Sequence, residues 1–199
     1  MFWDRVAWAY DIFANIMNRQ TNRRLCTVVG DLISPEDTVL ECACGTGLLS
    51  GVISKKCKHL TATDYSMSML KKSMKKYASQ SNITFSLANV LQLVYADESF
   101  DAVVAANVIH LLDDPFKALD ELFRVCKSGG QIIIPTYLGQ TKEGKDNSTS
   151  AVIVKTGVQF KRKFTMATYQ QFFADAGYTD VRYTLCEGKL PCAVAVLTQ

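Results

Sequence analysis

The chain of 199 residues is long enough for one domain with a substantial hydrophobic core. Hydrophobic residues make up 48% and charged residues 21%, a balance typical of globular proteins that excludes a wholly disordered chain. A net charge of +3 neither requires nor excludes a nucleic-acid partner, and the longest apolar run, residues 102–112, is too short for a membrane span.

Two amphipathic helices are expected before Pro35, because apolar residues recur at helical spacing over residues 3–17 and 25–33. Strand-like runs follow at residues 38–43, 60–63, 83–87, 100–105 and 131–136, with helical patterns at 46–56, 67–79 and 115–126. Ser66 and Asp114 stand at helix N-cap positions, and Pro115 suits a first helical turn. Residues 89–99 show no helical period.

The C-terminal part has a different pattern. Residues 165–176 predict a helix that ends at Gly177, and residues 181–187 and 193–198 predict a hairpin. Strands alternating with helices indicate a parallel sheet covered on both faces. The predicted fold class is therefore α/β, with a seven-stranded, mostly parallel sheet, helices on both faces and a C-terminal antiparallel hairpin.

The seven cysteines are odd in number and lack the spacing of a disulfide framework, so we expect reduced thiols and a cytoplasmic protein. The first residues include Asp4 and Arg5 among aromatic residues and do not resemble a signal peptide. Cys42 with Cys44 is spaced too closely for the usual zinc pair, so we expect no metal site.

A loop of small residues follows the first predicted strand, at Ala43, Gly45 and Gly47. Open α/β sheets bind ligands at the carboxyl ends of their strands, and small residues let the backbone approach a ligand there. Asp64, 19 residues after Gly45, ends the second strand, where a carboxylate can accept hydrogen bonds from a ribose diol. Either feature alone is also explained as a tight turn or a helix cap. Together they favour a nucleoside ligand.

Gly45, Gly47 and Ser50 nearly satisfy the dinucleotide fingerprint, so a nicotinamide cofactor is a rival interpretation. A more specific pattern comes from five ordered segments, at residues 41–47, 64–70, 87–90, 100–110 and 125–134. Their order and content resemble the motifs of class I S-adenosylmethionine-dependent methyltransferases, which have a Rossmann-like fold. Residues 2–13 also resemble, weakly, the start of the ubiquinone and menaquinone biosynthesis methyltransferases.

This resemblance implies S-adenosylmethionine as cofactor. By position, it assigns the methionine portion of the cofactor to Glu41, which would orient the ammonium group, and to Ala43, Gly45, Gly47 and Asn107. It assigns the ribose to Asp64 and the adenine to Tyr65, Met69, Asn89 and Val90. The chain departs from the family pattern at two positions. Ala43 replaces a glycine, which is tolerable if its φ is negative, and Asn89 replaces an aspartate, which should weaken binding because only its amide oxygen accepts.

Methyl transfer from a sulfonium requires alignment and exclusion of water more than acid–base catalysis, so no catalytic triad is expected. His110 is the candidate base or orienting group, with a buried structural histidine as the alternative. Tyr10 and Tyr137 are candidate walls of the acceptor pocket, although Tyr10 also lies on the apolar stripe of its helix.

The sequence therefore predicts methyl transfer to a small organic acceptor. An NAD-dependent oxidoreductase and a non-catalytic S-adenosylmethionine-binding protein are the alternatives, and a nucleic-acid enzyme is disfavoured because no appended binding domain is evident. We expect a single domain over residues 1–199, divided into a helical cap (1–35), a cofactor-binding core (36–137), a flap and acceptor region (138–164) and a C-terminal helix and hairpin (165–199). The acceptor and the oligomeric state are left open.

Overall fold

The computed structural model describes residues 18–141, 145–147 and 160–199. The helix predicted over residues 3–17, which carries Tyr10, lies outside the described residues, as does most of the predicted flap. The second predicted helix is α2 (Arg19–Asp31), which buries Leu25 and Val29 completely.

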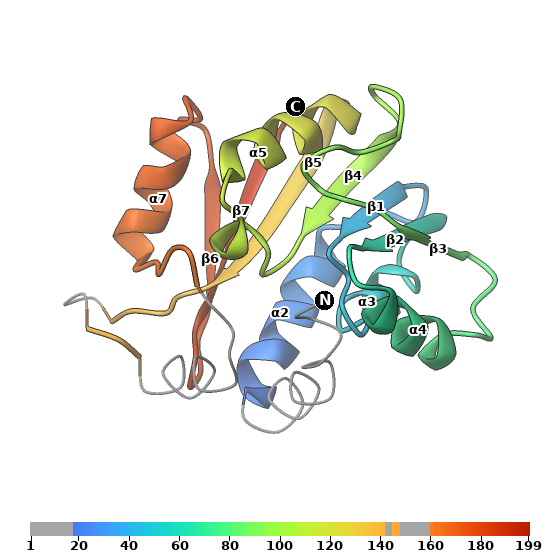
Figure 1. Cartoon of the computed structure of the whole chain (residues 1–199), viewed down its shortest axis with the longest axis horizontal. Helices are drawn as coiled ribbons and strands as arrows, with labels where there is room; N and C mark the ends of the chain where they lie inside the picture. The colour runs from blue at the N-terminus through green and yellow to red at the C-terminus, as the bar shows by residue number, and fades with distance from the viewer. Residues whose placement is uncertain (1–17, 142–144, 148–159) are drawn as a thin grey trace.

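The core of the molecule is one seven-stranded sheet (Figure 1). Its strands are β1 (Thr38–Cys42), β2 (His59–Asp64), β3 (Ile83–Leu87), β4 (Phe100–Ala105), β5 (Cys126–Tyr137), β6 (Arg182–Cys186) and β7 (Cys192–Thr198). The spatial order is β3-β2-β1-β4-β5-β7-β6. Strands β1 to β5 pair in parallel, whereas β7 lies antiparallel between β5 and β6. The predicted fold class is confirmed.

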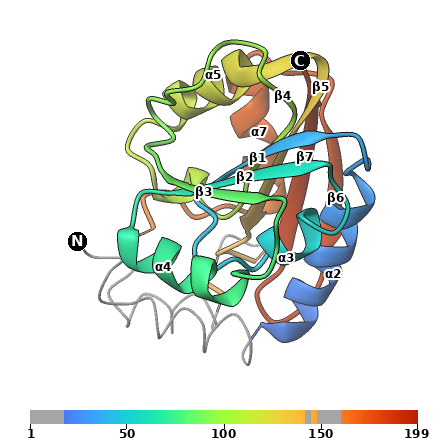
Figure 2. The ribbon, with the colours of Figure 1, turned by 90° about the vertical axis from the view of Figure 1, so that its right-hand side faces the viewer.

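Helices cover both faces of the sheet (Figure 2). On one face lie α2, α3 (Ser50–Ile53) and α4 (Met67–Lys76), and on the other lie α5 (Pro115–Val125) and α7 (Met166–Asp175). A buried apolar cluster fills the space on each side of the sheet. The inner strands are buried on both faces, which explains why their sequences are almost continuously apolar.

The predicted helix starts are present in the structure. The hydroxyl of Ser66 accepts from the backbone N–H of Met69 at 3.3 Å, and the carboxylate of Asp114 accepts from that of Lys117 at 3.0 Å. Each bond satisfies a backbone donor that has no partner within its own helix.

The helix predicted over residues 46–56 is shorter in the structure, where only Ser50–Ile53 form α3. Gly47 has a φ of +82°, which a right-handed helix cannot contain, so the chain stays in turns until Ser50. Strand β5 is longer than predicted, because Cys126 already pairs with Phe100 ahead of a register shift.

Candidate functional site

A cavity of about 360 Å³ opens at the carboxyl ends of the parallel strands. Its wall is built from the residues that follow β1, β2, β3 and β4, the edge at which open α/β sheets bind ligands. The lining includes most of the cofactor residues predicted from the sequence, namely Ala43, Gly45, Asp64, Tyr65, Met69, Asn89, Val90 and Asn107. The tertiary structure therefore brings together residues that are spread over 65 positions of sequence.

The loop after β1 turns sharply along the cavity. Ala43 and Gly45 have φ values of 55° and 57°, and the N–H of Cys44 between them donates to the carbonyl of Thr63 at 2.8 Å. The condition under which alanine would be tolerable, a negative φ, is therefore not met at Ala43. A left-handed conformation costs an L-residue about 1–2 kcal/mol, so this loop carries local strain that a glycine would not.

Gly47 does not line the cavity, in contrast to its neighbours in the loop. Its carbonyl accepts from the hydroxyl of Tyr77 at 2.7 Å, and a methyl group on its Cα would lie 2.5 Å from the Oγ atom of Ser73. Gly47 thus lets the loop pack against α4 and does not itself present backbone to the cavity. The sequence reasoning missed Tyr77, because nothing in its local pattern distinguishes it from other residues at a helix end.

Asp64 ties the loop to the end of β2. Its Oδ2 atom accepts from the N–H of Gly45 and its Oδ1 atom from that of Ser66, both at 2.8 Å. A carboxylate has about four acceptor positions, so these bonds are compatible with holding a ribose diol as well. Asp64 thus orders the start of α4, as the helix-cap interpretation predicted, and it also lines the cavity. Its contact with a ribose stays a prediction.

The two asparagines of the site have different surroundings. Asn107 has a φ of 53°, donates its N–H to Pro135 at 2.7 Å and accepts from the N–H of Tyr137 at 3.0 Å, so it joins the ends of β4 and β5. The side-chain oxygen of Asn89 accepts from the N–H of Leu91 at 3.0 Å. The atom predicted to contact adenine thus already orders the turn after β3.

Glu41 lies beneath the loop and outside the cavity lining. Side chains alternate along a strand, so Glu41 points to the α3 side of β1 whereas Cys42 lines the cavity. Its carboxyl group accepts from the hydroxyl of Ser50 at 2.6 Å, and burial raises its pKa to about 8. This placement does not support the predicted contact with an ammonium group.

His110 is in the short 3₁₀ helix η2 (Ile109–Leu111), which directly follows the cavity residues at the end of β4. Its ring is buried, 5.1 Å from that of Phe160, and burial lowers its pKa to about 3. Its Nδ1 atom has no hydrogen-bond partner among the described residues. The imidazole is therefore neutral near pH 7 and does not itself line the cavity.

Of the two predicted acceptor-pocket residues, only Tyr137 can be placed. It is buried at the end of β5, where its hydroxyl donates to the side-chain oxygen of Asn22 at 2.7 Å. It thereby connects the sheet to α2 and is not part of the cavity lining.

Apolar residues complete the cavity on the side of β4 and were not singled out in the sequence. Four of these residues line it, namely Leu91, Val108, Leu111 and Leu112. Their only sequence signal is their position beside the third and fourth motif segments. An apolar wall of this kind limits the access of water.

Within the described ranges, no group of three or more histidine, cysteine or acidic residues is arranged to hold a metal ion. None of the helices in that part of the chain combines the length and the apolar character needed to cross a bilayer. All seven cysteines are free thiols.

The chain is similar to known methyltransferases in both sequence and structure. Residues 40–134 match the model of a methyltransferase domain family. A demethylmenaquinone methyltransferase from Renibacterium salmoninarum is 27% identical over 94% of this chain and 86% of that protein. Another from Clavibacter sepedonicus is 34% identical, but the match covers 66% of this chain and 54% of that protein.

Among solved structures, an S-adenosylmethionine-dependent methyltransferase from Thermotoga maritima has the same fold. Its TM-score is 0.75 at 21% identity, and the match covers 98% of this chain and 96% of that chain. The family match falls on the strands and loops that build the cavity. Together with the ordered motif segments, these findings support a methyltransferase enzyme of class I, the S-adenosylmethionine-dependent type, with a weak resemblance to those of quinone biosynthesis.

Proposed function

We propose that the cavity binds S-adenosylmethionine and that the enzyme transfers its methyl group to a small organic acceptor. The observation that carries this proposal is the bond between the Gly45 N–H and the Asp64 carboxylate at the rim of the cavity, which sets a side-chain-free loop beside an acceptor for ribose hydroxyls. In the proposed site, Ala43, Gly45 and Asn107 hold the methionine portion and Asp64 holds the ribose. Tyr65, Met69, Asn89 and Val90 surround the adenine.

The bound cofactor would supply an activated methyl group on a sulfonium. The protein has to align the acceptor with that group and keep water away. Leu111 and Leu112 are placed to exclude water from the cavity. His110 is not placed to act as a general base, because its ring is buried and burial lowers its pKa to about 3. A structural role for His110 is favoured.

The names of the relatives make demethylated quinones the first acceptors to assay. The family match does not favour a nicotinamide-dependent oxidoreductase or a non-catalytic binding protein. We further propose that the chain acts as one domain, with the division predicted from the sequence, and that it works in the cytoplasm, where its seven thiols remain reduced.

Calorimetric titration with S-adenosylhomocysteine tests the cofactor proposal directly. Asp64→Asn should weaken binding about 10- to 100-fold, because a hydrogen bond to a charged group contributes about 1.5–3 kcal/mol. Asp37→Asn is the matched control, since Asp37 accepts from the N–H of Ser34 in the turn before β1, at the other end of the sheet. Tighter binding of NADH than of S-adenosylhomocysteine would refute the proposal. Thermal unfolding of each variant checks that it is folded.

Incubation with methyl-labelled S-adenosylmethionine and a panel of acceptors tests the transfer step. Label should appear in an organic product with the wild type and be reduced with Asp64→Asn. Tight cofactor binding without transfer to any acceptor would favour the non-catalytic alternative.

A further inference from the structure

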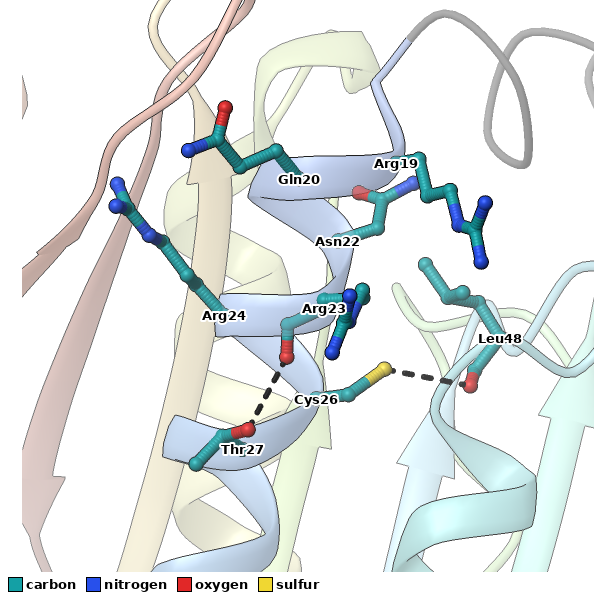
Figure 3. Close-up of a pocket in the computed structure, with 8 residues that line it drawn as sticks. All are labelled: Arg19, Gln20, Asn22, Arg23, Arg24, Cys26, Thr27 and Leu48. Atoms are coloured by element: carbon teal, nitrogen blue, oxygen red, sulfur yellow. Dashed lines mark hydrogen bonds between the residues drawn. The ribbon is translucent and has the colours of Figure 1, made fainter.

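A second and larger pocket, of about 820 Å³, lies between α2 and the loop after β1 (Figure 3). Its lining includes Arg19, Asn22, Arg23 and Arg24 from α2, together with Leu48 from the loop after β1. No carboxylate is among the described residues that line it. The pocket is therefore strongly cationic.

The charges of this pocket are not balanced within the described ranges. Arg24 forms an ion pair with Glu187 at 3.4 Å, whereas Arg19 and Arg23 have no ion-pair partner in that part of the chain. Two basic residues elsewhere in the fold do have such a partner, since Lys161 pairs with Asp113 and Lys163 pairs with Asp146.

Arg19 and Arg23 are one helical turn apart on α2, and both are exposed. Like charges at this spacing destabilise a helix by a few tenths of a kcal/mol. Arg19 also stands in the first turn of the helix, where the helix dipole disfavours a cation. Figure 3 shows the Arg19 side chain directed toward Leu48, and that of Arg24 directed to the opposite side of the helix. The two neighbouring arginines therefore destabilise the free protein slightly. An anion bound between their guanidinium groups and the loop would offset this repulsion, which explains why both arginines are present.

Two sets of contacts link residues that line the pocket to residues at the proposed cofactor cavity. Leu48 directly follows Gly47, and its carbonyl accepts a hydrogen bond from the Cys26 thiol of α2 at 3.9 Å. On the other side, Asn22 accepts from the hydroxyl of Tyr137, whose backbone N–H donates to the side chain of Asn107 in the cofactor cavity. The lining of the pocket is therefore linked by direct contacts to the loop after β1 and to Asn107, which the proposed function assigns to the methionine portion of the cofactor.

We infer that Arg19 and Arg23 form an oxyanion subsite that binds a carboxylate or phosphate group of the methyl acceptor. This inference rests on the proposed function. It narrows the acceptor from a small organic molecule to one that carries such a group, and so favours an anionic acceptor over the demethylated quinones that the names of the relatives suggest. Guanidinium groups suit this ligand because their planar N–H donors match both oxyanions. Leu48 and Cys26 supply apolar surface for the remainder of the acceptor.

The test compares naphthalene-2-carboxylate with its neutral carboxamide, and adds inorganic phosphate as a second anion. Binding is measured by calorimetry at low ionic strength with S-adenosylhomocysteine at saturation. The wild type should bind the carboxylate or phosphate more tightly than the carboxamide. Arg19→Gln/Arg23→Gln should weaken anion binding about tenfold or more. Lys71→Gln/Lys75→Gln, which removes two exposed charges one turn apart on α4 and outside the pocket lining, should leave it within about twofold. Added salt should weaken it as well.

Two results would overturn the inference. One is that neither anion is preferred over the carboxamide, or that their binding is insensitive to Arg19→Gln/Arg23→Gln. The other is that this variant weakens S-adenosylhomocysteine binding tenfold without a separate anion effect, which would assign the two arginines to the carboxylate of the cofactor. If the wild type did not bind S-adenosylhomocysteine, the cofactor proposal would be refuted instead. Anion binding measured in the absence of S-adenosylhomocysteine would then still test the subsite formed by Arg19 and Arg23.

Discussion

Ala43 is the residue at which the site departs most clearly from backbone preference. It has a φ of 55° in a loop whose other turning residues, Gly45 and Gly47, are glycines. The conformation is held by the neighbouring bonds from Cys44 to Thr63 and from Gly45 to Asp64. Strain of this kind persists only where surrounding contacts outweigh it.

Ala43→Gly should therefore stabilise the protein, by up to about 1 kcal/mol. Relief of the left-handed strain is offset in part by the greater freedom of glycine in the unfolded chain. Urea unfolding measures the change, and Ala62→Gly, at a buried position inside β2, is the control that should destabilise. A loss of stability in Ala43→Gly would show that the Ala43 methyl group makes a contact that outweighs its strain.

His110 predicts a specific pH dependence of stability. Burial lowers its pKa to about 3 in the folded protein, whereas an unfolded histidine titrates near pH 6.5. The folded state binds this proton less readily, so its contribution to stability is present above about pH 6.5 and is lost as the pH falls toward 3. Glu41 acts in the opposite direction, because burial raises its pKa to about 8 and its contribution is lost as the pH rises.

His110→Gln should remove the histidine part of this dependence. Between pH 7 and pH 5 the wild type should lose about 2 kcal/mol of unfolding free energy more than the variant, which follows from about 1.4 kcal/mol per pH unit below pH 6.5. Urea unfolding at several pH values provides the measurement. Parallel curves for the two proteins would mean that His110 is hydrated and titrates normally.

At the scale of elements, the contact between the loop after β1 and α4 positions one wall of the proposed cofactor site. Tyr77 caps the end of α4 and donates its hydroxyl to the carbonyl of Gly47, and its ring also leaves no space for a side chain at Gly51. The short α3 and the open turn before it follow from this contact. The position of the loop is therefore determined by a helix that lies later in the sequence.

Two glycine substitutions separate backbone strain from this packing. Gly47 and Gly129 have φ values of 82° and 76°, but an added methyl group would meet Ser73 and Tyr77 at Gly47 and nothing within 4 Å at Gly129. Gly129→Ala should cost about 1 kcal/mol from strain alone, and Gly47→Ala about 3 kcal/mol, because overpacking adds to the strain. Only Gly47→Ala should also weaken S-adenosylhomocysteine binding. Equal losses of stability would show that the loop moves away from α4 without cost.

At the scale of the whole molecule, the two apolar clusters on either side of the sheet bury nearly all of the cysteine thiols. Cys26 is the exception, half-buried where α2 borders the arginine-lined pocket. Burial raises the pKa of Cys42 to about 12 and also raises that of Cys26. Few thiolates are therefore present near neutral pH in the folded protein.

Thiol titration with a disulfide reagent should report this burial. The native protein should expose one slowly reacting thiol, and all seven should react in concentrated guanidinium chloride. Cys26→Ser should abolish the native reaction. Rapid reaction of several thiols in the native protein would mean that the packing around the sheet opens readily.

The sequence by itself determined most of the elements and the edge of the sheet at which the candidate site lies. Apolar periodicity is a local property that reports which face of an element is buried, and it located β3 and β4 at their observed bounds. Caps at Ser66 and Asp114 are local for the same reason. The small-residue loop and Asp64 identified the binding edge, because parallel strands bring their carboxyl ends together.

Only the tertiary structure decided which of the predicted residues reach the cavity. Gly47 and Tyr137 fit the sequence pattern, but each lies beside the cavity because a distant partner (Tyr77 or Asn22) holds it there. Glu41 lies beneath the cavity because side chains alternate along β1 and Cys42 takes the cavity side. The sign of φ at Ala43 was likewise set by the bonds of its neighbours to β2. Contacts between residues far apart in the chain leave no local period or spacing, so the amino-acid pattern could not report them.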